Sequence, residues 1–271
     1  MSAHTFQAAE AALRALNTAA ENIWIDCHAH WPTLSIEAVP TIDSTNSALM
    51  RRARAGQLDP TVMMAVTQSA GKGRSGKHWI SPAGDSLSFS VGLPLTNVTG
   101  LAGLSLVVGA VLAEQLSPRV HIKWPNDLWV GQQKLAGILV EITSMGPTHY
   151  VVIGVGINLK TPTLASPAAN AMPPIGLDAL TDEAPVMSDV AHRCVTALIQ
   201  AMVDFPLAGF APWSARFAAR DALAGVAVQL SDGQSGIARG ISPQGALRLE
   251  LANGTMTDVI SQEVSVRPCA L

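Results

Sequence analysis

The sequence predicts an α/β (α+β) fold in which a mixed sheet flanked by helices is followed by a small β-barrel. Short apolar, strand-like runs alternate with helical stretches from about residue 36 onward. From residue 222 the pattern changes to short runs separated by DG, PQG and NG turns, which are typical of hairpins. We therefore expect an N-terminal helix and linker (1–35), a sheet domain (36–220) and a β domain (221–271).

The N-terminal elements follow from local patterns. The first 24 residues are amphipathic and have no basic start followed by an apolar run, so we expect a short helix and no secretory signal. The sheet domain begins with a strand near Ile36 and a polar turn at Asp43–Asn46. A helix over Ser47–Ala55 and a strand over MMAVTQ (63–68) follow.

An uncharged stretch runs from Ser86 to Ala113 and exceeds the roughly 20 residues that cross a bilayer. Pro94, Asn97 and Thr99 interrupt it, however. The sequence therefore predicts a strand followed by a buried helix over residues 100–116, and no membrane span.

Three further strand-like runs and a long helical region complete the domain. The runs are VHIKWPNDLWV (120–130), KLAGILVEI (134–142) and YVVIGVGINL (150–159), the pattern of adjacent strands. Residues 161–186 are rich in Pro, Ala and Thr, and we expect a long loop there. Helical periodicity from Ser188 to Ala219 makes Ser188 the expected N-cap.

The composition limits the class of partner. The chain has 271 residues, 48% of them hydrophobic, and a net charge of −3, which argues against a general nucleic-acid or anionic-membrane surface. Any anion site must therefore be local. Cys27, Cys194 and Cys269 give no disulfide framework, so we expect a reducing cytoplasm. The run Cys27-His28-Ala29-His30 has no second ligand cluster at suitable spacing, which favours an incidental segment over a metal site.

The segment GKGRSGKHW (71–79) combines three glycines with Lys72, Arg74 and Lys77. Glycines allow close backbone approach and the cations can bind carboxylate or phosphate oxygens, so the segment suits an anion. It is not a P-loop, because His78 stands where Ser or Thr is needed, and its glycine spacing does not match the dinucleotide fingerprint. Taken alone, it could equally be a solvated basic turn.

A second cationic group lies on the predicted strands. KWPND (123–127) and KLAGIL (134–139) are joined by the turn at Gly131–Gln133. A hairpin would bring Lys123 and Lys134 to one side of the sheet, where two ammonium groups repel unless an anionic ligand or Asp127 lies between them. This pattern indicates a site.

Five motifs together carry a resemblance to a known family. They are DSTN (43–46), QSAGKGRSGKHW (68–79), KWPNDLWV (123–130), KLAGILVE (134–141) and GVGINL (154–159). In this order, and followed by a small β tail, they resemble a bacterial biotin–protein ligase over residues 36–268. The resemblance implies a catalytic domain like that of class II aminoacyl-tRNA synthetases, followed by an SH3-like β domain.

The resemblance also implies a two-step reaction. The carboxylate of biotin attacks the α-phosphate of MgATP, giving biotinyl-5'-AMP and pyrophosphate. A lysine of the biotin carboxyl carrier protein then attacks the mixed anhydride, and AMP leaves. ATP and Mg²⁺ are thus expected, although the sequence does not indicate which residues hold the metal.

The family's functional residues can be carried over position by position. The implied catalytic residues are Arg74, Lys134, Lys123 and Asp127. The implied biotin contacts are Ser44, Thr45, Gln68, Gly71, Lys72, Gly73, Arg74, Lys134 and Gly137. The implied nucleotide contacts are Lys72, Arg74, Trp79, Lys123, Asn126 and Asn158.

Within these sets, the resemblance assigns specific roles. Ser44, Thr45 and Gln68 would bind the ureido head of biotin, and Asn158 would meet the adenine. Arg74 would bridge the carboxylate and the phosphate, while Lys134 would stabilise charge there. Trp79 would help to close the pocket, and Asp127 would position the incoming lysine.

The chain departs from the family pattern in two places. The family usually has Gly-Arg-Gly-Arg where this chain has Gly71-Lys72-Gly73-Arg74, and lysine lacks the planar fork for a bidentate contact. About 35 residues precede the catalytic region, too few for the helix-turn-helix domain of some members, so we predict no DNA binding. Strand edges of the catalytic domain could pair two copies in a homodimer.

Several alternatives remain at this stage. A lipoate–protein ligase shares the adenylate chemistry, and a non-enzymatic biotin-sensing regulator would also bind the ligand. Asn126-Asp127 could be a simple turn, and Ser44 could be only a helix cap. Gly154 and Gly156 could mark close strand packing. Three tryptophans could be core aromatics: Trp79, Trp124 and Trp129.

Overall fold

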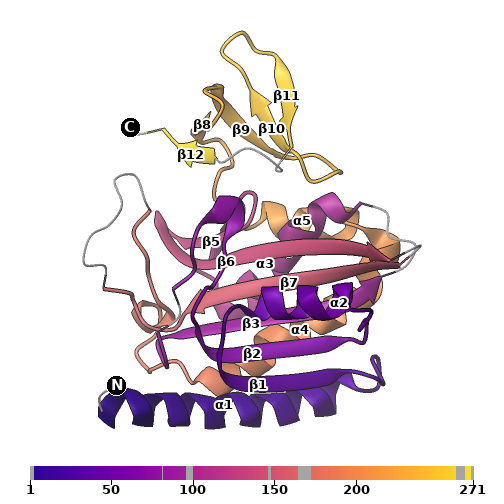
Figure 1. Ribbon diagram of the computed structural model, residues 1–271. Coiled ribbons are helices and arrows are strands. Elements are labelled where there is room, and N and C mark those ends of the chain that lie inside the picture. Colours follow the sequence, from indigo (N-terminus) through magenta and orange to yellow (C-terminus); the bar gives the residue numbers. More distant parts are fainter. Residues whose placement is uncertain are drawn as a thin grey trace.

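A seven-stranded mixed sheet forms the larger domain of the computed structural model, which describes residues 3–80, 82–95, 100–145, 148–163, 172–260 and 266–269. The strand order is β1-β2-β3-β7-β6-β5-β4 (Figure 1). β1 and β2 pair in parallel, and the other neighbouring strands pair antiparallel. The strands are β1 (Ser35–Ile42), β2 (Thr61–Gln68), β3 (Ser86–Leu95), β4 (His121–Lys123), β5 (Asp127–Val130), β6 (Gln133–Met145) and β7 (Thr148–Asn158).

Helices cover both faces of this sheet. Figure 1 shows α2 (Thr45–Arg54) in front of the strands and α3 (Leu104–Leu116) and α4 (Met187–Ala208) behind them. Side chains of β2 alternate between the faces, because Met63 packs with α2 while Val62 and Met64 belong to the larger core behind. Burial on both faces explains why β2 is apolar without alternation. The mixed sheet flanked by helices is therefore confirmed.

The N-terminal helix is longer than the sequence suggested. α1 spans Ala3–Cys27, and its buried residues recur every three or four positions. This stripe joins the large core and comprises Ala12, Leu16, Ala19, Ile23 and Cys27. His192 of α4 and Asp26 of α1 lie 2.7 Å apart, which adds a polar contact between the two helices.

The uncharged stretch folds as β3 and α3, as predicted, with residues 96–99 outside the described part of the chain. α3 is buried over most of its length, and Leu104, Val107 and Val111 lie in the large core. Within the described residues, no helix is long and apolar enough to cross a membrane.

Two predicted helix starts were wrong, and one predicted helical region is divided into two helices. α2 begins at Thr45, two residues before the predicted start, and Ser44 is its N-cap. α4 begins at Met187, and Ser188 lies inside its first turn, where its hydroxyl donates to Asp189 instead of capping the helix. Helical structure does extend to about residue 219, but not as one helix, because Gly209 at φ 59° ends α4. A 3₁₀ turn (Ala211–Trp213) and α5 (Ser214–Ala218) follow.

The C-terminal region is a five-stranded antiparallel sheet of order β11-β10-β9-β8-β12. Its strands are β8 (Ala227–Leu230), β9 (Ser235–Ile241), β10 (Leu247–Glu250), β11 (Met256–Val259) and β12 (Val266–Pro268). The DG, PQG and NG turns place Gly233, Gly245 and Gly254 at positive φ, which confirms the hairpin prediction. The domain limits at residues 35 and 220 stay predictions.

One turn of this sheet contacts the larger domain. The indole Nε1 of the fully buried Trp124 donates to the carbonyl of Gly245 over 3.1 Å. A Cβ on Gly245 would lie 2.9 Å from the Cα of Gly103, next to the start of α3. This turn therefore packs against Trp124, which directly follows β4 and precedes Pro125.

Candidate active site

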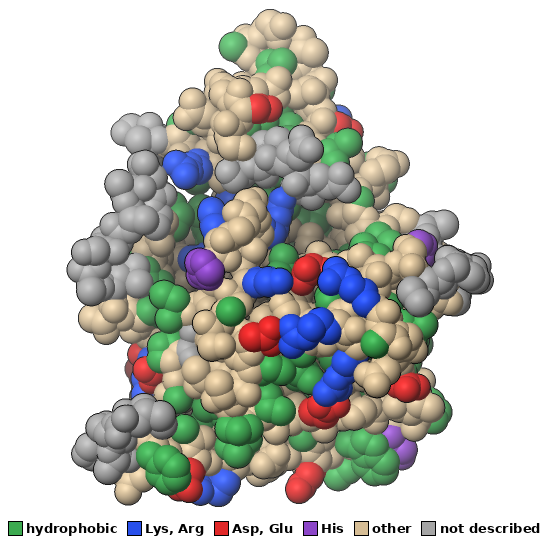
Figure 2. All heavy atoms as spheres, in the orientation of Figure 1, with side chains coloured by type: hydrophobic (Ala, Val, Ile, Leu, Met, Phe, Trp, Pro, Cys, Tyr) green, Lys and Arg blue, Asp and Glu red, His purple; other side chains and the backbone are tan. Residues whose placement is uncertain are grey.

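A cavity of about 170 Å³ lies beside loop 71–79 and the ends of β5 and β6. Lys and Arg side chains gather on this face of the molecule (Figure 2). Twelve predicted site residues line the cavity: Ser44, Thr45, Gln68, Lys72, Gly73, Arg74, Trp79, Lys123, Asn126, Asp127, Lys134 and Gly137. The structure therefore brings together residues that are up to 93 positions apart in the chain, since 137 − 44 = 93.

Loop 71–79 forms a tight hairpin over this cavity. The amide of Gly73 donates to the carbonyl of Lys77 over 2.7 Å, and that of Trp79 donates to Gly71 over 2.9 Å. A Cβ on Gly71 would lie 2.4 Å from the Trp79 carbonyl oxygen, so close backbone approach requires glycine there. Gly71 itself does not line the cavity. Its role here is to allow the turn that places Arg74 and Trp79.

Arg74 points from this loop toward the strands. Its Nη1 donates to the side-chain oxygen of Asn126 over 3.2 Å. The guanidinium is half-buried, and burial lowers its pKa while the nearby Asp127 raises it. Asn126 in turn donates through Nδ2 to the Ile138 carbonyl over 2.9 Å. Asn126 therefore serves both as a turn residue and as the anchor of the arginine.

Two lysines and one carboxylate lie at the centre of the cavity. Lys134 Nζ is 2.7 Å from Asp127 Oδ1. Lys123 is 7% exposed, and burial is the largest cause that lowers its pKa to about 8. Asp127 opposes that shift, whereas Lys134, Lys77 and Arg74 reinforce it. Asp127 thus lies among the cations. The sequence predicted that either Asp127 or an anionic ligand would separate Lys123 and Lys134.

The other end of the cavity is polar but uncharged. The Thr45 amide donates to Gln68 Oε1 over 2.8 Å, and Ser44 caps α2 by accepting from the amide of Ser47 over 3.4 Å. Sequence reasoning missed Asn46, which also lines the cavity, and Ser90, whose hydroxyl lies 2.6 Å from Asn46 Oδ1 and 2.7 Å from Thr45 Oγ1. Serine at alternate positions of an otherwise apolar β3 was the signal that could have found Ser90.

Gly154 and Gly156 form part of the floor on β7. A Cβ on Gly154 would lie 2.1 Å from Asn46 Oδ1, and one on Gly156 would lie 2.2 Å from Cε2 of Trp79. These glycines therefore make room for side chains of the site. Trp79 covers β7 here, and its buried Nε1 has no hydrogen-bond partner among the described residues.

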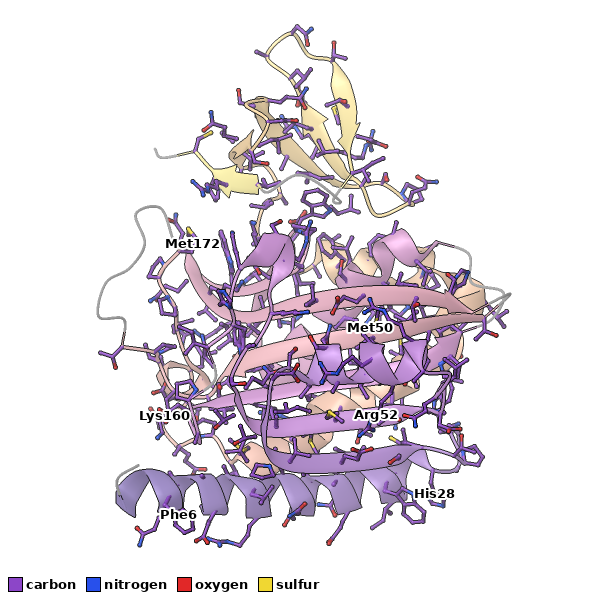
Figure 3. All side chains as sticks on the ribbon, viewed as in Figure 1. Phe6, His28, Met50, Arg52, Lys160 and Met172 are labelled. Atoms are coloured by element: carbon purple, nitrogen blue, oxygen red, sulfur yellow. The ribbon has the colours of Figure 1, made fainter. Side chains whose placement is uncertain are left out.

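A second cavity of about 390 Å³ adjoins the first and shares His78, Trp79 and Lys134 with it. Asn158 lies in this second cavity, and its Nδ2 donates to the carbonyls of Lys134 over 3.3 Å and of Ile175 over 3.1 Å. Lys160 and Met172, labelled in Figure 3, also line it. Of the predicted loop 161–186, residues 164–171 lie outside the described residues.

Two of the three tryptophans are core residues. Trp124 is fully buried and Trp129 is buried beneath Lys123, whose Nζ lies 5.7 Å from the ring centroid. The alternative that these tryptophans are core aromatics is therefore right for Trp124 and Trp129, whereas Trp79 lines both cavities.

Comparisons with known proteins agree with this fold. The model of the biotin/lipoate A/B protein ligase family matches residues 38–158, and that of the biotin protein ligase C terminal domain matches residues 225–267. The chain therefore belongs to the biotin/lipoate A/B protein ligase family.

Its curated relatives come from the biotin branch of that family. The bifunctional ligase/repressor BirA of Escherichia coli is 37% identical, over 86% of this chain and 74% of its own length. The biotin–[acetyl-CoA-carboxylase] ligase of Mycobacterium tuberculosis is 32% identical, over 86% and 89%. The Aquifex aeolicus biotin protein ligase solved with biotin and ATP has a TM-score of 0.68 at 23% identity, covering 88% of this chain and 99% of that one, which confirms the fold.

Proposed function

We infer that this protein is a biotin protein ligase that uses ATP to form biotinyl-5'-AMP and then transfers biotin to a lysine of a biotin carboxyl carrier protein. The observation that carries this inference is the convergence of Arg74, Lys123 and Lys134 around Asp127, next to the uncharged polar end formed by Ser44, Thr45 and Gln68. Such a site suits a ligand with a polar neutral head and a carboxylate that must meet a phosphate.

The first step joins two anions. A carboxylate oxygen attacks the α-phosphorus, and the bond from that phosphorus to the pyrophosphate oxygen breaks. Cations held in place before the reaction reduce the repulsion and stabilise charge that develops on phosphate oxygens. Arg74, anchored on Asn126, bridges the carboxylate and the phosphate, while Lys134 and the buried Lys123 neutralise the phosphate oxygens.

The second step requires an amine nucleophile near the same carbonyl. When a substrate phosphate binds Lys134, the ion pair between Lys134 and Asp127 breaks. The Asp127 carboxylate is then left next to the acyl group without its lysine partner. Asp127 can then hydrogen-bond the acceptor lysine and orient it. The lysine nitrogen attacks the acyl carbon, the acyl–phosphate bond breaks, and AMP leaves.

The two adjoining cavities support separate places for the ligands. The polar end of the first cavity takes the ureido head, and the second cavity takes the adenine beside Asn158. Trp79 lines both cavities and therefore lies where the acyl group and the nucleotide meet. Lys72 is exposed at the mouth, so we assign it a charge contact with the nucleotide, without the bidentate geometry of arginine.

Mg²⁺ fits this site as a partner of the nucleotide. Within the described residues, no group of three or more His, Cys, Asp and Glu side chains could hold a metal. Asp127 is the one carboxylate among the described residues that line the first cavity. Magnesium bound through one carboxylate and substrate phosphates is the usual arrangement in such enzymes. It would supply charge neutralisation to the triphosphate, and Asp127 is the residue that would contact it.

The partner and the assembly are further parts of this proposal. The acceptor is the carrier domain of a carboxylase, and the three free cysteines suit a cytoplasmic location. β5 pairs with β6 only over Gln133–Gly137, so the later part of β6 has no strand partner on that side among the described residues. This open edge supports a homodimer formed by strand pairing. The net charge of −3 supports the prediction that the protein does not bind DNA.

Ligand-dependent exchange of labelled pyrophosphate into ATP tests the enzymatic function. We expect exchange with biotin and none with lipoate, followed by biotinylation of an added carrier domain. Exchange with lipoate alone would assign the chain to the lipoate branch. Binding of biotin without any exchange would instead favour the non-enzymatic sensor.

A further inference from the structure

A series of hydrogen-bonded polar side chains runs from the partly exposed Glu141 on β6 to the polar end of the active-site cavity. It begins at Glu141, whose Oε2 accepts from Asn46 Nδ2 over 3.0 Å. Asn46 Oδ1 lies 2.6 Å from Ser90 Oγ, which lies 2.7 Å from Thr45 Oγ1. Three of these residues have exposed fractions of 3% or less (Thr45, Asn46 and Ser90). Thr45 and Asn46 line the cavity, whereas Ser90 and Glu141 do not.

We propose that Asn46 and Ser90, oriented by Glu141, are positioning residues that fix the Thr45 hydroxyl as a hydrogen-bond acceptor toward the ligand. The proposal rests on the function inferred above and deepens it, because it names the groups that select a ligand head carrying N–H donors. None of these three residues was among the predicted ligand contacts.

The direction of each hydrogen bond follows from the donors available. The Glu141 carboxylate has only acceptors to offer, so Asn46 must turn Nδ2 toward it. The other Nδ2 hydrogen goes to the Leu139 carbonyl over 3.3 Å. Oδ1 of Asn46 therefore faces Ser90 and needs a donor.

The hydroxyl of Ser90 supplies that donor and thereby fixes Thr45. A hydroxyl has a single hydrogen, so a Ser90 that donates to Asn46 can only accept from Thr45. Thr45 Oγ1 is also 3.2 Å from Gln68 Oε1, but the 2.7 Å contact with Ser90 is shorter and takes the hydrogen. The free lone pair of Thr45 is then the group that a bound ligand meets.

Close packing keeps this chain in place. Gly154 lies directly against the amide of Asn46, since a Cβ there would come within 2.1 Å of Oδ1. Asn46 is buried and its amide is bonded on both sides, so a rotation would leave buried polar groups without partners. The polarity of Thr45 is thus set by the fold before a ligand arrives.

An acceptor at Thr45 discriminates between ligand classes. A ureido ring carries two N–H donors, whereas a dithiolane ring carries none. A ligand without a donor would leave the remaining lone pair of the buried Thr45 oxygen without a donor, which is more costly than the bond is favourable. The chain from Glu141 to Thr45 therefore favours a ureido head over a lipoyl head.

The experiment uses the full chain with Ser90→Ala and Asn46→Leu, read by calorimetric biotin binding and by steady-state exchange. Loss of the positioning group should weaken biotin binding and raise its KM roughly tenfold or more. The KM for ATP should stay within about twofold of wild type, because the nucleotide cavity is not touched. Glu141→Gln, whose amide oxygen can still accept from Asn46, should keep most of the affinity that Glu141→Leu loses.

Two further measurements separate positioning from a structural defect. In Ser90→Ala the Thr45 hydroxyl is free to donate a hydrogen bond. The affinity for an analogue with oxygen in place of one ureido N–H should therefore rise relative to the affinity for biotin. Thr45→Val combined with Ser90→Ala should be no weaker than Thr45→Val alone. Thr61→Val is the matched control, because it removes a buried hydroxyl that donates to the Asp59 carbonyl and has no part in the hydrogen bonds from Glu141 to Thr45.

The outcomes distinguish the two claims. Wild-type protein that does not bind biotin would overturn the proposed function. Wild-type protein that binds biotin, with Ser90→Ala unchanged or losing biotin and the analogue equally, would overturn the positioning role. If Asn46→Leu does not fold, Ser90→Ala and the Glu141 pair decide the question.

Discussion

Lys134 and Asp127 form an ion pair, with Nζ 2.7 Å from Oδ1, at the centre of the active-site cavity. The pair arises from the β5–β6 hairpin, in which Asp127 lies opposite Gly137 and Lys134 lies opposite Trp129. In the protein without ligands, the Lys134 ammonium and the Asp127 carboxylate are ion-pair partners of each other. In the mechanism proposed above, phosphate binds Lys134 and the acceptor lysine binds Asp127, so opening this ion pair would link the first chemical step to the second.

Replacing Lys134 with alanine should abolish most of the first step. In the proposed mechanism the lysine stabilises charge on the phosphate, and loss of one such donor typically slows a reaction by roughly 10²–10³-fold. Biotin-dependent pyrophosphate exchange measures this step. Lys134→Arg keeps the charge and should retain more activity than Lys134→Ala. Normal exchange in Lys134→Ala would remove this residue from the catalytic set.

Asp127→Asn should separate the two steps. The amide keeps the shape of the carboxylate but loses its charge, so adenylate formation should slow through a weaker metal contact while transfer to the carrier slows more. A single-turnover experiment can measure this by following preformed biotinyl-5'-AMP after the carrier domain is added. Equal losses in both steps would show that Asp127 acts mainly through Lys134 or through the metal.

Arg74→Ala should release the intermediate. Arg74 is held by Asn126 and placed to bridge the acyl and phosphoryl groups, so its removal opens the site to water. We expect faster escape of biotinyl-5'-AMP into solution, measured as labelled adenylate that passes a filter. Asn126→Ala, which removes only the anchor, should produce a weaker form of the same effect. An unchanged lifetime in Arg74→Ala would contradict the bridging role.

The sequence predicted the fold well because its main signals are local. The hairpins of the C-terminal sheet follow from glycines that must adopt positive φ, and α3 follows from an uninterrupted apolar run. The start of α4 was mispredicted because a serine with a suitable pattern behind it can equally lie within the first turn. There Ser188 bonds to Asp189.

The site was predictable where its residues stand in motifs, and much less so elsewhere. Arg74, Asn126 and Lys134 lie in three conspicuous segments, and the fold brings them together. The contact between Asn46 and Glu141 spans 95 positions and depends on the pairing of β6 with β7. Neither residue type predicts the hydrogen bond between Asn46 and Glu141, because asparagine in a turn and glutamate in a strand are common on a solvated surface.

The pH dependence of stability should report Lys123. Burial lowers its pKa from 10.5 to about 8 in the folded protein, so the unfolded chain binds this proton more tightly between those values. The cost of the buried ammonium is therefore complete below pH 8 and disappears as the pH rises toward 10.5. At pH 7, Lys123→Met should raise the free energy of unfolding by on the order of 1–3 kcal/mol while lowering exchange activity.

Urea unfolding at pH 7 and at higher pH checks this sign. The stability advantage of Lys123→Met should shrink as the pH rises from 8 toward 10.5, because the folded wild-type protein then no longer holds a buried ammonium while the unfolded chain still binds the proton. Equal stability of the two proteins at pH 7 would mean that Asp127 fully compensates the burial of Lys123.

The junction of the two domains can be tested with a pair of tryptophans. Trp124 and Trp129 are both buried, but the Nε1 of Trp124 donates to Gly245 whereas that of Trp129 has no partner among the described residues. Trp124→Phe should leave the Gly245 carbonyl without its donor and destabilise the protein by about 1 kcal/mol more than Trp129→Phe does.

Urea denaturation compares the two variants, since both lose a similar volume and differ in the hydrogen bond. A detached C-terminal sheet would appear as an early, separate transition in Trp124→Phe. Because Trp124 stands between Lys123 and the turn that holds Asn126, the same variant should also raise the KM for ATP. Identical unfolding curves for the two variants would show that the bond from Trp124 to Gly245 does not stabilise the contact between the domains.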